Sequence, residues 1–155
     1  MKKGISFLIA NRYGSYLGEV LKPFNTTDFN WLIGGEESYF VEDDTLGKPL
    51  FPEDSIVLDG KILKNIIEKN EYYLIFADLK AYPKGNNPAD IKTYDEFLKS
   101  NCQLVLLVVD TIYMIIYCKD SEKLESLFQN AKLKGFEDLQ YITDENDTIE
   151  RLSCW

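Results

Sequence analysis

The spacing of apolar and polar residues changes along the chain, and these changes predict its secondary structure. Alternating or continuous apolar runs predict strands over 3–9, 29–33, 38–42, 72–82, 102–109, 112–118 and 138–143. Apolar residues that recur every three to four positions predict helices over 13–22, 60–69, 94–100 and 121–134. This order predicts an α+β fold, with one largely antiparallel sheet and helices packed mainly on one face.

Short polar signals predict how these elements begin and how they are joined. Gly34 and Gly35 suit a tight turn, which predicts a hairpin of strands 29–33 and 38–42. Residues 43–58, with two prolines and a glycine, are expected to be irregular. Strands 102–109 and 112–118 are expected to form the central hairpin of the sheet, turning at 110–111. Helix N-caps are predicted at Asp59, Thr93 and Asp120.

Strand 72–82 has two faces of different character. Tyr73, Ile75, Ala77, Leu79 and Ala81 alternate on the face that we expect to pack on the core. On the other face, apolar residues give way to Asp78, Lys80 and Tyr82, so this end of the strand is expected to be exposed to water.

Length and composition indicate one domain with an ordinary core. The chain has 155 residues, of which 45% are hydrophobic, and residues 1–155 are expected to form a single domain. The apolar block 104–118 is too short to cross a bilayer and contains Asp110, so we expect no membrane partner. The apolar run 5–10 is short and has no cleavage signature, so we expect a cytoplasmic protein. Oligomeric state stays open.

The charge and the missing residue types exclude several functions. The net charge is −9, which disfavours nucleic-acid binding. The chain has no histidine, so it cannot by itself build a Ser-His-Asp or Cys-His site, and zinc hydrolase chemistry is disfavoured. Cys102 and Cys118 lie at the outer ends of the predicted central hairpin, and we interpret them as small apolar residues of the core. Whether their thiols are adjacent stays open. We expect no cofactor.

Seven of the acids lie within residues 36–54, where Lys48 is the only base. Such a stretch can be a solvated loop, a metal site or a surface for a basic partner, and its spacing matches no calcium-loop pattern. Our leading hypothesis is a small acidic binding protein that presents a carboxylate and aromatic surface to a basic protein, as toxin-neutralising immunity proteins do. The residues that we expect to bind are Glu36, Glu37, Tyr39, Glu42, Asp43 and Asp44.

The alternative is a small enzyme, with or without a metal ion, at the end of strand 72–82. Its residues would be Asp78, Lys80 and Tyr82, because magnesium nucleases use an acid and a lysine two positions apart on a strand. Acid-x-Lys begins at Asp59, Asp78 and Asp90, which is about the frequency that chance gives for this composition. A third hypothesis, a small-ligand sensor, would need an apolar pocket between helices and sheet.

Several stretches, together covering nearly the whole chain, resemble a family of short proteins from Bacillus-like bacteria. They are "KGISF", "YLGE", "NWLIGGEESY", "GKPLFPE", "EYYLIFADLKAYPKG", "QLVLLVVD" and "YITDEND…RLSCW". The family is described as a domain of unknown function. The resemblance implies a small intracellular bacterial protein and supplies no catalytic residue.

Overall fold

The structure is a computed structural model that describes residues 1–51, 56–149 and 151–153, with the side chains of residues 35 and 36 excepted. In this part of the chain, eight strands and four α-helices follow one another with one 3₁₀ turn. In order they are β1 (Lys2–Leu8), α1 (Tyr16–Val20), the 3₁₀ turn (Thr26–Asp28), β2 (Phe29–Glu42), β3 (Thr45–Pro49), β4 (Ile56–Asp59), α2 (Gly60–Lys69), β5 (Tyr72–Pro83), α3 (Tyr94–Lys99), β6 (Leu104–Val109), β7 (Tyr113–Cys118), α4 (Ser121–Leu133) and β8 (Glu137–Thr143).

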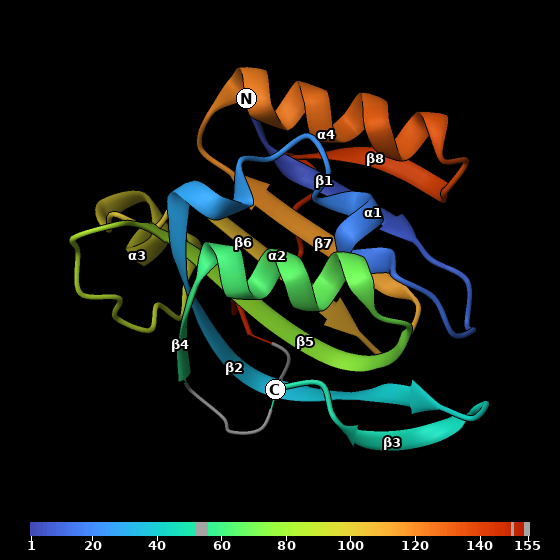
Figure 1. Ribbon diagram of the computed structural model, residues 1–155. Coiled ribbons are helices and arrows are strands. Elements are labelled where there is room, and N and C mark those ends of the chain that lie inside the picture. The colour runs from blue at the N-terminus through green and yellow to red at the C-terminus, as the bar shows by residue number, and fades with distance from the viewer. Residues whose placement is uncertain (52–55, 150, 154–155) are drawn as a thin grey trace.

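The strands form one antiparallel sheet in the order β3-β2-β5-β6-β7-β1-β8, and β4 pairs with β2 beside this path. Helices α1, α2 and α4 lie over one face of the sheet, as Figure 1 shows. Helix α3 belongs to a separate cluster of buried residues. The predicted α+β class, with an antiparallel sheet and helices mainly on one face, is confirmed.

The core consists of two clusters separated by the sheet. The larger cluster joins α1, α2 and α4 to residues such as Trp31, Leu106 and Ile116, each 0% exposed. The smaller cluster contains Phe97 of α3, Val105 and Tyr117. Because successive strand residues point to opposite faces, β6 supplies both clusters and is buried almost throughout, as its continuous apolar run predicted.

The predicted helix caps form. The Asp120 carboxylate accepts hydrogen bonds from the backbone N–H groups of Glu122 and Lys123, each at 3.0 Å. Asp59 accepts from Lys61 N–H, and the Thr93 hydroxyl accepts from Glu96 N–H. These bonds satisfy donors that a helix start otherwise leaves unpaired. Among the described residues, no helix is long and apolar enough to cross a membrane.

The hairpin predicted at Gly34 and Gly35 is wrong. Strand β2 runs through both glycines and pairs with β5 on either side of them, with register shifts between Gly34 and Ser38. The chain turns instead at Asp43 and Asp44, whose φ angles are 52° and 59°. Residues 43–58 were expected to be irregular, but they contain β3 and β4; residues 52–55 lie outside the described part. Pairing with the long neighbour β5 outweighed the local preference of two glycines for a turn.

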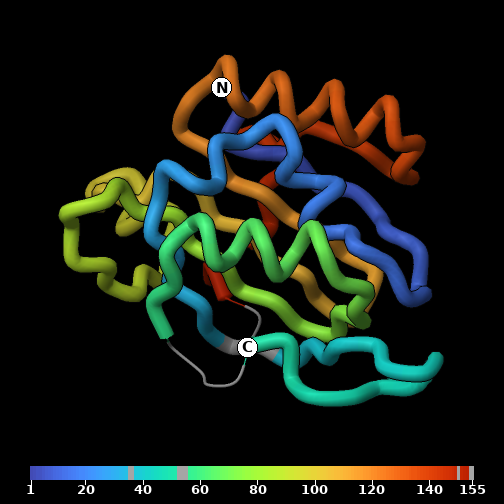
Figure 2. The backbone as a smooth tube through the Cα atoms, in the orientation of Figure 1, coloured from blue at the N-terminus to red at the C-terminus, as the bar shows by residue number. Residues whose placement is uncertain are grey.

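The segment after β8 returns across the sheet on the face opposite α1, α2 and α4, as the red trace in Figure 2 shows. Asp147 accepts hydrogen bonds from Lys3 of β1 and from the Tyr117 hydroxyl of β7, at 2.7 and 2.9 Å. Farther on, Leu152 is buried and its N–H donates to the Lys92 carbonyl at 2.9 Å. This segment and α3 together cover part of the sheet and leave the rest open.

Candidate functional site

The β2–β3 hairpin carries most of the predicted binding residues. Glu42 ends β2, and Asp43 and Asp44 form the exposed turn. Glu37 and Tyr39 lie half-buried within β2, and the side chain of Glu36 lies outside the described residues. From Glu37 to Asp44 the chain extends roughly 20 Å at the usual strand rise. The structure therefore groups Glu42, Asp43 and Asp44 at the hairpin tip and places Glu37 farther back.

A hollow of about 490 Å³ adjoins this tip and is lined by Tyr13, Leu46, Tyr73, Asn11 and Arg12. Tyr13 and Tyr73 stack edge to face with ring centroids 5.7 Å apart, and both Tyr13 and Leu46 are more than a third exposed. The Tyr73 hydroxyl donates to Asn11 Oδ1 at 2.5 Å, which fixes the ring. Leu46 connects the hollow to the acids because it lies on β3, two residues after Asp44.

We call Tyr13, Tyr39, Glu42, Asp43, Asp44, Leu46 and Tyr73 the hairpin surface. Sequence reasoning missed Tyr73, which it assigned to the core face of β5. Tyr72 and Leu74 lie in the larger cluster together with Ala77 and Leu79, so the buried positions change parity between residues 74 and 77. The register shift between β2 and β5 at this point accounts for the change, and strict alternation could not reveal it.

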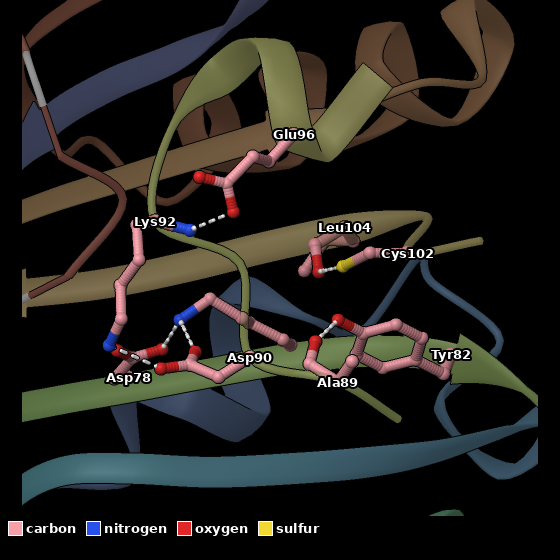
Figure 3. A network of polar contacts seen from close by, with 9 residues as sticks. Asp78, Tyr82, Ala89, Asp90, Lys92, Glu96, Cys102 and Leu104 are labelled. Carbon is pink, nitrogen blue, oxygen red and sulfur yellow. Dashed lines mark hydrogen bonds and ion pairs between the residues drawn. The ribbon is translucent and has the colours of Figure 1, made fainter. Parts of the chain in front are cut away.

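The predicted enzyme residues are buried, contrary to the expectation of an exposed strand end. Lys80 is 2% exposed and Asp78 is 5% exposed. Lys80 Nζ lies 2.7 Å from Asp78 Oδ1 and 3.2 Å from Asp90 Oδ1, and Lys92 Nζ lies 2.6 Å from Asp90 Oδ2 (Figure 3). Burial raises the pKa of Asp78, against the opposing effect of Lys80. The cover is the 84–93 loop, whose position the sequence did not indicate.

Tyr82 and Cys102 are also buried, and their side chains donate hydrogen bonds to nearby backbone carbonyls. The buried Tyr82 hydroxyl donates to the Ala89 carbonyl, and burial raises the pKa of Tyr82. Cys102 Sγ donates to the Leu104 carbonyl at 3.4 Å, and burial raises the pKa of this thiol to about 12. Burial also raises the pKa of Cys118 to about 11. The two thiols lie in different core clusters, and both are in their unreactive protonated form near neutral pH.

The geometry around Lys80 is that of a structural network. Each charged group in it has an opposite partner, which is the condition for placing ions in an apolar interior. The hollow beside the β2–β3 hairpin is lined by other residues. Within the described residues, no group of three or more acidic or cysteine side chains is placed to hold a metal ion.

Comparisons with known proteins agree with the resemblance seen in the sequence. Residues 2–153 match the family described as "Protein of unknown function (DUF2691)". The chain is 42% identical over 153 residues to the uncharacterized protein YncE of Bacillus subtilis (strain 168), with 99% of each chain covered. No solved structure matches. With a family match and a relative that both extend over nearly its whole length, the chain belongs to the DUF2691 family.

Proposed function

We propose that this protein is a binding protein whose hairpin surface receives a basic protein partner, in the manner of an immunity protein. One observation carries the proposal: the hairpin that bears three exposed carboxylates at its tip also contributes Leu46 to a hollow lined by two tyrosines. Carboxylates attract and orient a basic partner, while tyrosines anchor interfaces with little loss of side-chain freedom.

The hollow suits a lysine or arginine side chain from the partner. The Tyr13 and Tyr73 rings offer faces for a cation, and Leu46 offers apolar contact for the methylenes of that side chain. Arg12 also lines the hollow, but its Nε donates to the Tyr16 hydroxyl at 2.8 Å and is thereby held. The carboxylates of Glu42, Asp43 and Asp44 are exposed on the same hairpin as Leu46, where charge speeds association.

The enzyme hypothesis receives less support from the same structure. Its residues are buried in a network that already satisfies them, and the thiol nearest to that network has a raised pKa. The binding hypothesis instead rests on groups that reach solvent.

The test compares three versions of the protein as bait in a Bacillus subtilis lysate, because this organism has a relative. The hairpin variant carries Glu42→Gln, Asp43→Asn and Asp44→Asn. The two asparagines tolerate the positive φ of the turn, so the hairpin should keep its shape. The control carries Glu122→Gln, Glu137→Gln and Glu145→Gln, which remove the same charge from exposed positions on other elements.

We expect the wild type and the control to capture the same basic proteins and to release them as salt rises. The hairpin variant should lose those proteins. Tyr73→Ala should weaken capture even where all the acids are kept, because it removes an aromatic anchor. Equal capture of the same proteins by the hairpin variant and the control would overturn the proposal.

A further inference from the structure

A second site lies on the sheet face opposite α1, α2 and α4 and shares no residue with the hairpin surface. It is a groove of about 470 Å³, within the size range of small-molecule sites. Its floor is formed by two rows of residues that run across the strands. The first row consists of cross-strand partners on β6, β7, β1 and β8: Leu107, Ile115, Ser6 and Gln140. The second row holds Val109, Tyr113 and Leu8.

The floor changes from apolar to polar along these rows. The side toward β6 and β7 presents Val109, Ile115 and Tyr113, of which Tyr113 is 50% exposed. The side toward β8 presents Ser6 and Gln140. Helix α3 and the returning segment bury the neighbouring row, with Val105 and Tyr117, and they also bury Leu107 at the edge of the floor. Val109, Tyr113 and Ile115 stay partly or largely exposed. An apolar surface of this kind, concave and next to polar groups, is typical of a binding site.

One wall of the groove is formed by described residues of the returning segment, 146–149, 151 and 153, and so includes Arg151. Arg151 is exposed, and among the described residues its guanidinium has no ion-pair or hydrogen-bond partner. The N–H of the next residue, Leu152, donates a hydrogen bond to the Lys92 carbonyl. The Lys92 side chain pairs with Asp90, in the network around Lys80. Arg151 therefore stands toward the β6 end of the groove, next to the apolar part of the floor.

The acids that line the groove do not cancel this charge. The Asp147 carboxylate already has its own partners, because it accepts hydrogen bonds from Lys3, the Tyr117 hydroxyl and Ile149 N–H. Asp138 lies on β8, at the opposite end from Arg151. The two ends of the groove therefore differ in chemistry. One end has a cation beside apolar side chains, and the other end has polar side chains.

We propose that this groove binds a medium-chain aliphatic monocarboxylate. The carboxylate pairs with Arg151, since a guanidinium matches its two oxygens. The chain lies over Val109, Ile115 and Tyr113 and ends near Leu8. From β6 to β1 the floor spans two strand spacings, about 10 Å, which is roughly the length of an eight-carbon chain. Ser6 and Gln140 limit further extension because burying them under methylenes would leave them unpaired.

The test is an NMR titration of the ¹⁵N-labelled full chain with octanoate, with octanol as the neutral match. We expect saturable shifts at the backbone amides of Ser6, Leu107 and Ile115, and about tenfold weaker binding of octanol. Arg151→Gln should weaken octanoate binding about tenfold, to the level of octanol binding. The control Lys132→Gln removes an exposed base on α4 and should leave octanoate binding unchanged. Hexanoate should bind several-fold more weakly than octanoate, and dodecanoate no more tightly.

Arg151 is exposed and has no side-chain partner within the described part of the chain, so Arg151→Gln should keep a well-dispersed spectrum. Val109→Gln provides a second variant, which makes the floor polar without touching the charge and should weaken octanoate and octanol alike. The proposal is overturned if octanoate produces no saturable shifts in the groove at millimolar concentration. It is equally overturned if octanol binds as tightly as octanoate, or if Arg151→Gln leaves octanoate binding unchanged.

Discussion

Lys80 is almost wholly removed from water, and its two carboxylate partners differ in surroundings. Asp78 is buried with it, and desolvation raises the pKa of that carboxyl. Asp90 is about half exposed; burial by itself would raise its pKa, but hydrogen bonds from Lys92 and Lys80 lower it overall. Lys80 therefore links a strand residue that is costly to ionise with a loop residue that ionises readily, and in this way attaches the 84–93 loop to β5.

This arrangement predicts that removing one ion is worse than removing the buried pair. Lys80→Met leaves Asp78 without its nearest partner and should lower the free energy of unfolding by about 3–5 kcal/mol. Adding Asp78→Leu to that variant should restore about 1–2 kcal/mol, because both charges then leave the interior. Urea unfolding of the wild type, both single variants and the double variant measures the difference.

The matched control is the exposed pair Lys99 and Asp95 on α3, which lies at 2.9 Å but in water. Lys99→Met should change stability little, because exposed ion pairs contribute little. A double variant at Asp78 and Lys80 that is no more stable than Lys80→Met alone would contradict this account of the network.

Sequence spacing placed Asp78 and Lys80 on one face of a strand but could not show that this face is covered. Asp90 was visible as another acid two positions before a lysine, yet nothing local indicated that the two pairs would meet. Their meeting depends on the path of the 84–93 loop, which is fixed by distant contacts such as the bond from Leu152 to Lys92. Local patterns carry little information on contacts of such large sequence separation.

Two hairpins of the sheet share an uncommon turn geometry. Asp43 and Asp44 join β2 to β3 with positive φ, and Asp110 and Thr111 join β6 to β7 with φ of 50° and 74°. Turns with two positive φ angles match the twist of the strands and favour Asn, Asp and Gly. A β-branched residue such as Thr111 is strained there.

Thr111→Gly should therefore stabilise the protein, by about 0.5–1 kcal/mol in the free energy of unfolding, since glycine adopts this φ without strain. The comparison is Thr45→Gly in β3, where the backbone is that of a strand and glycine should destabilise. Chemical denaturation of both variants checks the contrast. If Thr111→Gly were as destabilising as Thr45→Gly, strain at this turn would be refuted.

The same turns show what the pattern of a strand can and cannot predict. The β6–β7 turn was placed correctly because two long apolar runs are separated only by Asp110 and Thr111. The β2 turn was misplaced because Gly34 and Gly35 interrupt a strand whose two halves both pair with β5. A glycine pair marks either a turn or an irregularity within a strand, and only the partner strand decides between them.

For the molecule as a whole, the two faces of the sheet are covered by different means. Three helices cover one face, whereas the other depends on α3 and on residues 144–149 and 151–153, which reach across β1 and β7. The carboxylate of Asp147 fixes that segment with three hydrogen bonds. The position of the groove wall, including Arg151, therefore depends in part on the carboxylate of Asp147.

The titration of Asp147 should be visible in the stability of the whole protein. Burial by itself would raise the pKa of Asp147, but hydrogen bonds from Lys3, Ile149 and Tyr117 lower it overall. An acid with a lowered pKa in the folded state stabilises the fold above its ordinary pKa of about 4, and this contribution is lost as pH falls through the lowered value. Asp78, with its raised pKa, acts in the opposite direction as pH falls.

Asp147→Asn isolates the first of these effects. At about pH 7 it should lower the free energy of unfolding by about 2 kcal/mol, because an amide accepts fewer and weaker hydrogen bonds than a carboxylate and leaves Lys3 without its nearest partner. The difference from the wild type should shrink as the pH falls from about 5 toward 3, since the wild type then loses the same charge. Asp144→Asn removes the exposed acid that lies 3.7 Å from Lys3 and should show neither effect. Urea unfolding across this pH range measures all three proteins, and a difference for Asp147→Asn that stays constant with pH would mean that charge on Asp147 does not hold the segment.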